Sequence, residues 1–143
     1  MTTAVLDDHL LRDLLSGELS AELQELLDQH SPATTNHYYL RLCKSVVAAR
    51  GGRLTGSWSP ERRRALGRAL LDLPESIEIV PVRSLAFRMA ELASVHPVST
   101  LGAEAIAAAA HLRGPLCVWI GDDGPRIREG ASVTGVVYKT IVR

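Results

Sequence analysis

Two aspartates that directly follow a short apolar run are the first candidates for chemistry in this chain. The run Ala4–Leu6 leads into Asp7 and Asp8, and a leucine-rich helical pattern begins immediately afterwards. In an α/β fold this order places Asp7 at the carboxyl end of a strand, where ligands and metals bind. An aspartate at this point can also simply cap the following helix. Acids that return to the same edge later in the chain would favour the first interpretation.

Apolar residues at helical or strand spacing divide the chain into alternating elements. Four strands are predicted, at 4–6, 77–82, 116–120 and 133–142. Helices are predicted near 10–17, 20–30, 34–50 (ended by Gly51-Gly52), 59–71, 84–93, 102–112 and 126–131. Strands separated by helices predict a parallel sheet with helices on both faces. The expected fold is therefore α/β, a single three-layer α/β/α domain over 1–143, with 4–6 central and flanked by 77–82 and 116–120.

The net charge of zero hides an uneven distribution along the chain. Residues 1–30 contain seven acids and one base, a net of −6, whereas residues 31–68 contain eight bases and one acid, a net of +7. A basic segment of this kind can bind phosphate backbones or an acidic partner. It can equally pack against the acidic N-terminal helices of the same chain.

Arg62, Arg63 and Arg64 form the densest part of the basic segment. Their helix needs one apolar stripe, so Leu66 and Leu70 are expected to face the core and the three arginines to be largely exposed. They are candidates for binding RNA or a protein partner.

Bulk properties favour a protein of the cytosol. The chain has no apolar stretch long enough to span a bilayer and no signal-like N-terminus. Its two cysteines, Cys43 and Cys117, lie in helical and strand patterns and are expected to be small buried hydrophobic residues.

The order of elements resembles that of PIN domains, the fold of metal-dependent ribonucleases that include the toxins of many bacterial toxin–antitoxin pairs. Val5–Leu11 looks like the opening strand of the family with its first catalytic aspartate. The segment 92–105, the alanine run after it and Gly114-Pro115-Leu116 look like the region of the third acid. The resemblance implies an Mg²⁺ or Mn²⁺ site, an RNA substrate, an antitoxin-like partner and a homodimer.

Comparison with the family pattern assigns the remaining acids. The alanine-rich helix carries Gly102 where the family has aspartate, with Glu104 nearby, and Asp122 or Asp123 follows the strand 116–120. The resemblance thus makes Asp7, Glu104, Asp122 and Asp123 the candidate catalytic residues, with Asp7 and Asp122 as metal ligands. The sequence Asp122-Asp123-Gly124-Pro125 is also typical of an ordinary tight turn.

The second family acid would fall near Tyr38 or Tyr39, and residues 31–50 contain no acid at all. Arg41 lies on the same helix, where a guanidinium beside Asp7 would replace the cation by an ion pair. Alternatively, Arg41 and Tyr38 bind phosphate and a stacked base. At least one of the two tyrosines is expected to be a packing residue.

Two functions of different class follow. The first, which the lost acids favour, is a non-catalytic PIN-like domain with a degenerate metal site that binds a protein partner or nucleic acid. The alternative is a working ribonuclease, in which several carboxylates hold Mg²⁺ or Mn²⁺ and the cation activates the attacking water.

Overall fold

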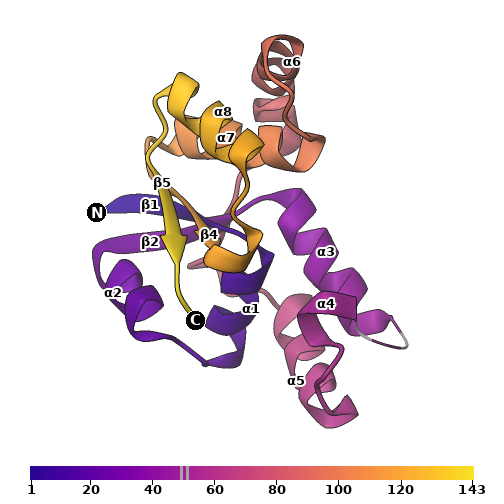
Figure 1. The fold of residues 1–143 in the computed structure, drawn as a ribbon. Helices are drawn as coiled ribbons and strands as arrows, with labels where there is room; N and C mark the ends of the chain where they lie inside the picture. Colours follow the sequence, from indigo (N-terminus) through magenta and orange to yellow (C-terminus); the bar gives the residue numbers. More distant parts are fainter. Residues whose placement is uncertain (49, 51) are drawn as a thin grey trace.

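The computed structural model describes residues 1–48, 50 and 52–143, and it has one five-stranded parallel sheet (Figure 1). The strands run in the order β3-β2-β1-β4-β5, and every neighbouring pair is parallel. Their bounds are β1 (Thr2–Leu6), β2 (His30–Thr34), β3 (Glu78–Ile79), β4 (Leu116–Trp119) and β5 (Tyr138–Ile141). The central position of residues 4–6 and the parallel sheet are confirmed.

Helices cover both faces of this sheet, which confirms the three-layer α/β fold. Figure 1 shows α7 and α8 on one side, α1 and α2 on the other, and α3, α4 and α5 grouped beyond α1. The bounds of the helices and of the two 3₁₀ turns are α1 (Asp8–Ser16), α2 (Ala21–Gln29), α3 (Asn36–Val47), α4 (Gly52–Thr55), α5 (Pro60–Leu71), η1 (Val82–Ser84), α6 (Ala86–Val95), α7 (Thr100–Leu112), η2 (Ile120–Asp122) and α8 (Pro125–Thr134). None of the described helices is both long and apolar enough to cross a membrane.

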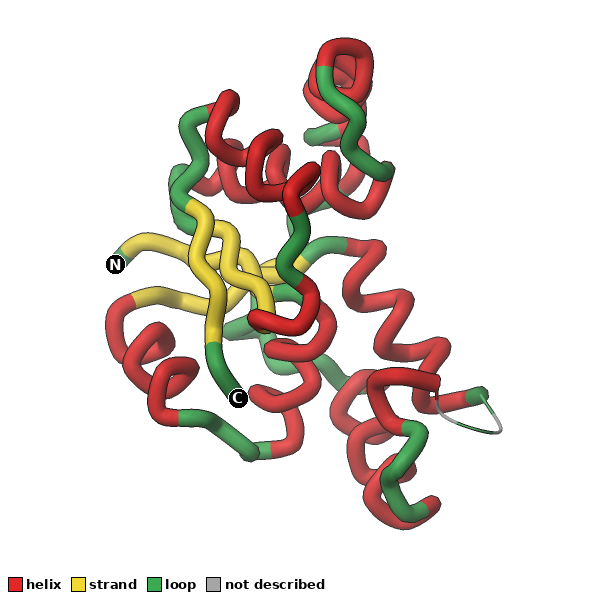
Figure 2. The backbone as a smooth tube through the Cα atoms, in the orientation of Figure 1, coloured by secondary structure: helices red, strands yellow, loops and turns green. Residues whose placement is uncertain are grey.

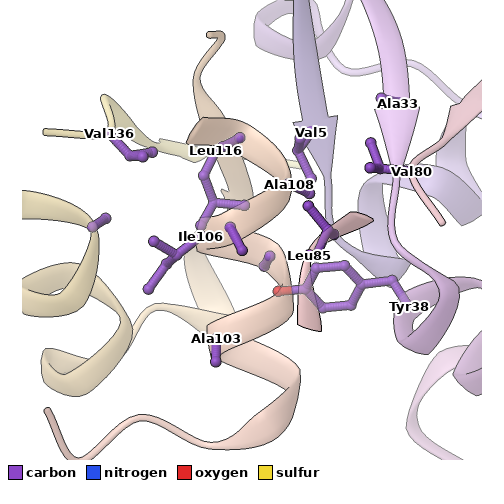
Figure 3. Packing of buried hydrophobic residues seen from close by; sticks show 14 of the residues in the cluster. Val5, Ala33, Tyr38, Val80, Leu85, Ala103, Ile106, Ala108, Leu116 and Val136 are labelled. Carbon is purple, nitrogen blue, oxygen red and sulfur yellow. The ribbon is translucent and has the colours of Figure 1, made fainter. Parts of the chain in front are cut away.

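The alanine-rich helix α7 forms the centre of the larger core. Residues 105–109 of this helix are buried. They belong to one cluster with Val5 of β1 and Leu116 of β4 (Figure 3). Small alanine side chains allow the helix to approach the sheet closely, and their burial is the main stabilising contribution of this face.

The strand β2 was not predicted, because Ser31-Pro32 was interpreted as a helix break. In the structure Pro32 lies within this strand, opposite Ala4 of β1. The next strand, β3, pairs only with Ala33 and Thr34. Pro32 therefore occupies a part of β2 with one neighbouring strand, where a proline is tolerated. As a consequence, β1 is flanked by β2 and β4 rather than by the segment 77–82, which lies at the sheet edge.

Other differences concern the ends of elements. The edge strand predicted at 77–82 is only Glu78–Ile79, and the final helix extends to Thr134, so β5 begins at Tyr138. The third helix, predicted to run to Arg50 and to end at Gly51-Gly52, is α3 and ends at Val47, and Gly52 begins α4; Ala49 and Gly51 lie outside the described residues. The tube in Figure 2 shows how the strands converge at the centre of the molecule.

Candidate metal centre

The strand order has its switch point between β1 and β4. Strands β2 and β3 lie on one side of β1, and β4 and β5, which follow them in the sequence, lie on the other side. Ligands of open α/β sheets bind at the carboxyl ends of the strands at this point. Asp7 directly follows β1, and Asp122 ends the 3₁₀ turn after β4. The topology thus brings together two acids that are far apart in the sequence.

Asp7 is fixed by three backbone contacts. Its own N–H donates to Cys117 O (3.1 Å), while Oδ1 accepts from Leu10 N (2.9 Å) and Oδ2 from Trp119 N (2.9 Å). The side chain therefore caps α1 and also ties β1 to β4. It is 1% exposed. Capping and a site role, which were alternatives from the sequence, are compatible at this residue.

Four side chains form what we call the acidic cluster: Asp7, Asp8, His9 and Asp122. One ligand atom from each lies within 4.8 Å of the others, and the first three residues are buried. His9 Nδ1 lies 2.5 Å from Asp122 Oδ2 and 3.4 Å from Asp8 Oδ1. The His9 ring also lies against Trp119, with the ring centres 4.4 Å apart.

One carboxylate oxygen of the cluster has no hydrogen-bond partner among the described residues. This oxygen is Asp8 Oδ2, and it is buried. The Nε atom of Arg41 lies 3.3 Å away, but without the alignment of a hydrogen bond. The expected pairing of Arg41 with Asp7 is thus replaced by a contact with Asp8.

Crowding of acids within the cluster perturbs their protonation. Burial raises the pKa of Asp7 well above its usual value, against its two backbone donors, and the neighbouring Asp8 and Asp122 raise it further. Burial alone would lower the pKa of His9, but its contacts with Asp122 and Asp8 raise it to about 9. Although partial burial opposes it, the contact with His9 lowers the pKa of Asp122. The raised pKa values of Asp7 and His9 both favour protonation, which acts against the build-up of negative charge in the cluster.

The cluster opens into what we call the carboxyl-edge cavity, of about 450 Å³. Three arginines line it together with the acids: Arg41, Arg53 and Arg126. Arg53 Nη2 lies 3.6 Å from Asp122 Oδ1, and its side chain is 72% exposed. A cavity with carboxylates at its base and guanidinium groups at its rim is suited to a cation and an anionic ligand together.

Glu104 lies outside the acidic cluster. It is completely buried in α7, where Oε1 accepts from His37 N (3.1 Å) and contacts His37 Nδ1 (2.7 Å). Asn36 Nδ2 is 3.4 Å from Oε2. The carboxylate thus connects α7 to the first turn of α3, whose free N–H groups favour an anion.

Asp122 and Asp123 have separate roles in spite of their adjacency. Asp123 accepts hydrogen bonds from Arg128 Nη2 (2.8 Å) and from the Tyr138 hydroxyl (2.9 Å). The bond with Arg128 lowers the pKa of Asp123. Asp123 therefore joins α8 to β5, and only Asp122 belongs to the acidic cluster.

Tyr38 is one of the two tyrosines near the expected second acid, and Gly102 is the best match to the position of the expected third. Both line the carboxyl-edge cavity. Tyr38 is 4% exposed, and its ring extends from α3 towards α7 (Figure 3). It is thus largely a packing residue, while Tyr39 donates from its hydroxyl to Leu70 O on α5.

The arginine triplet lies on α5, with Leu66 and Leu70 buried as predicted. Arg64 is exposed, but Arg62 and Arg63 are half-buried. Arg62 stacks over Trp58 (3.6 Å to the ring centre) and pairs with Glu18, and Arg63 donates to Ala48 O (2.7 Å). The contact with Glu18 shows that the basic segment packs in part against the acidic N-terminal helices.

Sequence reasoning did not identify His9 and Trp119 as members of the site; it named Asp8 beside Asp7 without giving it a ligand role, and it included Arg53 only in the basic segment 31–68. His9 had a detectable signal, because it lies within the first turn after Asp7, next to the strand end. Trp119 had none, and the basic segment gave no indication that Arg53 would contact Asp122, since both positions depend on tertiary contacts.

No protein-family model matches this sequence, and a comparison with curated proteins returned no match. The parallel α/β fold and the buried acidic cluster are compatible with a PIN-like domain.

Proposed function

We propose that the acidic cluster binds a divalent cation, Mn²⁺ or Mg²⁺, and that the carboxyl-edge cavity binds RNA through its phosphate backbone. The observation that carries this proposal is the convergence of three carboxylates, those of Asp7, Asp8 and Asp122, with the imidazole of His9. Carboxylate oxygens are the preferred ligands of Mg²⁺, and an imidazole in the same group suits Mn²⁺ as well.

The buried donor set fits such a cation. Asp8 Oδ2 is buried without a hydrogen bond and has only the misaligned Arg41 Nε, 3.3 Å away, as a counter-charge, so it can still coordinate a cation. Each oxygen of Asp7 accepts one N–H and retains a second acceptor site. A cation bound here would also relieve the repulsion among the three acids.

The arginines support binding of a phosphate backbone. Arg41 and Arg53 contact Asp8 and Asp122, respectively, so a cation that neutralises these carboxylates makes the guanidinium groups available to phosphate. Arg126 lines the same cavity and is exposed. Guanidinium groups bind phosphate oxygens in a bidentate manner, which also fixes orientation.

Binding of RNA is favoured over its cleavage because the other acids expected from the resemblance are replaced or bonded elsewhere. Tyr38 or Tyr39 and Gly102 stand near the positions of two acids of the family pattern, and Glu104 is engaged by Asn36 and His37. An antitoxin-like protein partner and a homodimer stay predictions from the resemblance.

Hydrolysis of RNA is the second candidate, and a specific observation favours it. Three carboxylates still converge beside an open cavity. A bound divalent cation supplies activation of water and neutralisation of charge on the phosphoryl oxygens. In that case Asp7 and Asp122 would coordinate the cation, and Arg41, Arg53 and Arg126 would orient the phosphodiester.

The cation is tested by thermal unfolding with and without Mn²⁺, and two adjacent aspartates provide a matched pair of variants. Mn²⁺ at one hundred times its Kd should stabilise the parent by about 2.7 kcal/mol. Asp123→Asn should retain this stabilisation, and Asp122→Asn should lose it. Equal stabilisation of both variants, or none in the parent, would contradict a cation at the cluster.

RNA binding is tested separately, with a fluorescent single-stranded RNA at low salt in the presence of Mn²⁺. Arg53→Ala and Arg126→Ala should each weaken binding several-fold and flatten its salt dependence. Arg64→Ala, which removes an exposed arginine outside the cavity, is the control. Cleavage of the same RNA by the parent, lost in Asp122→Asn, would establish the second candidate instead.

A further inference from the structure

Two adjoining cavities lie at the opposite, amino edge of the sheet, and we call them the amino-edge cavities. The larger, of about 550 Å³, is bounded by the starts of β1 and β2 and by the segments that precede β4 and β5. The smaller, of about 350 Å³, lies between α6 and α7. Arg88 and Arg113 line both of them. Two subsites therefore share the same pair of guanidinium groups.

The side chains around these cavities are basic. Besides the shared arginines, the larger cavity is lined by Lys139 and His30, and the smaller by His111. None of the described residues that line either cavity is an aspartate or a glutamate. The charge of Arg88 and Arg113 is thus not balanced by an acid within these cavities, in contrast to the carboxyl-edge cavity, and it favours an anionic ligand, whereas Lys139 also lines a neighbouring pocket with Glu22 and Glu25.

Arg113 adopts a backbone conformation that is unusual for an arginine. It caps the end of α7 with φ of 55°, and it is the one described non-glycine residue with a positive φ. The left-handed conformation is strained for residues other than glycine, which is the usual residue at this position. Strain of this kind concentrates at functional sites. The cap itself needs no arginine, since it consists of backbone N–H bonds to Ala109 O and Ala110 O.

The larger cavity also has an apolar wall, to which Ala109, Pro115, Val136 and Val137 contribute. The carbonyl groups at the end of α8, which would repel an anion, are capped by the N–H of Gly135. A ligand can therefore place phosphates against the arginines and an apolar group against this wall. The volume of each cavity is in the range of small-molecule sites.

We propose that the amino-edge cavities bind a small ligand with two or more phosphate groups, of the nucleoside diphosphate or triphosphate class. Two phosphates fit because two subsites share Arg88 and Arg113, and Lys139 supplies a third positive charge. The apolar wall accommodates the nucleoside. This site is independent of the proposed cation and RNA site, because the two share no residue.

The test is a titration of the metal-free, full-length chain with ATP, pyrophosphate and inorganic phosphate, followed by ¹H–¹⁵N NMR and calorimetry. ATP and pyrophosphate should bind more tightly than phosphate and should shift the amides of Arg113, Gly114 and Gly135. ATP tighter than pyrophosphate supports a nucleoside subsite, and equal affinities overturn that part of the proposal. Shifts confined to the carboxyl edge, or none at millimolar ATP, would overturn the site altogether.

Variants separate binding from folding. Arg88→Ala and Arg113→Gly should each weaken ATP binding roughly 10-fold to 100-fold, as expected for the loss of a charged hydrogen bond. Glycine adopts the left-handed conformation readily, so Arg113→Gly should fold at least as well as the parent. Arg83→Ala removes a nearby exposed arginine outside both cavities and is the matched control. Unchanged affinity in Arg88→Ala and Arg113→Gly would contradict the proposal.

Discussion

The two edges of the sheet differ in how their charged side chains are balanced: acids and arginines lie together in the carboxyl-edge cavity, whereas the amino-edge cavities have basic side chains without acids among the described residues that line them. Asp7, Asp8 and Asp122 gather at the carboxyl edge, and Arg88 and Arg113 at the amino edge. Because every strand is parallel, helices that follow strands begin at the carboxyl edge and return to the amino edge. The positive end of α1 favours Asp7 and Asp8, and the negative end of α7 favours Arg113. Arg88, by contrast, lies in the first turn of α6, where the dipole does not favour a base. Helix direction thus accounts for only part of each charge group.

Burial distinguishes the two edges in a way that dipoles do not explain. Asp7 and Asp8 are almost completely buried, whereas Arg88 and Arg113 are exposed. A helix dipole contributes about 0.3–1 kcal/mol, far less than the several kcal/mol that desolvation of a charge costs. Buried acids need a cation or a proton to offset that cost, while exposed bases cost little. At the carboxyl edge, the burial of the acids supports a binding site. At the amino edge, the support comes from the meeting of Arg88 and Arg113 and from the left-handed backbone of Arg113.

The largest expected difference between the edges is in stability. Asp7→Ala removes the cap of α1 and leaves the buried N–H of Trp119 without its acceptor. These losses should lower the free energy of unfolding by roughly 2–4 kcal/mol. The corresponding amino-edge variant, Arg88→Ala, should change it by less than about 0.5 kcal/mol. Urea unfolding of both measures the contrast, and similar losses would mean that the two edges are equally structural.

The pH dependence of stability tests whether His9, in the acidic cluster, carries a positive charge. The pKa of His9 is raised from its ordinary 6.5 to about 9, so the folded state holds a proton that the unfolded state releases earlier. The resulting stabilisation, at most about 3 kcal/mol, is complete below pH 6.5, falls between 6.5 and 9, and is lost above 9. Melting temperatures of the metal-free parent should therefore fall over this interval more steeply than those of His9→Gln. Parallel curves for the two proteins would show that His9 carries no such proton.

The sequence predicted the strand-end acids but not their partners. The local pattern placed Asp7 at a strand end, whereas the resemblance to PIN domains suggested Asp122 or Asp123 without choosing between them; the parallel sheet brings Asp7 and Asp122 together. The pairing of Glu104 with His37 joins residues 67 positions apart and depends on how α7 packs against α3. Such contacts leave no periodic signal in the sequence.

Two missed features have a similar physical origin. The strand β2 contains Pro32, which signals a break unless the neighbouring strand is known to be short. The amino-edge cavities depend on Arg88 and Arg113, which are separated in the sequence and meet only because α6 packs against α7. Local propensity predicts that helices exist, while tertiary packing decides which of their side chains meet.

An aspartate introduced at position 102 tests whether the cation binds in the carboxyl-edge cavity. A Cβ atom there would lie 3.5 Å from Ser99 Oγ and 3.8 Å from Ile127, which are ordinary contacts, and the residue lines the cavity. Gly102→Asp adds a carboxylate near the start of α7, where the dipole also favours it. It should strengthen Mn²⁺ binding about tenfold, or 1.4 kcal/mol, as measured by calorimetry. Gly102→Asn, of equal size and without the charge, is the control, and an equal Mn²⁺ affinity in both would place the cation elsewhere.

The smallest expected effect concerns the stability of the amino edge. Arg113 holds a left-handed conformation that costs a non-glycine residue about 1–2 kcal/mol. Glycine relieves this strain but adds freedom to the unfolded chain, so Arg113→Gly should raise the free energy of unfolding by about 1 kcal/mol or less. Arg113→Ala removes the same charge but keeps the strain, and it should show no such gain in urea unfolding. A loss of stability in Arg113→Gly would mean that the guanidinium stabilises the end of α7 by more than the strain costs. The arginine would then have a sufficient structural reason at this position, and the strain would no longer support a ligand at the amino edge.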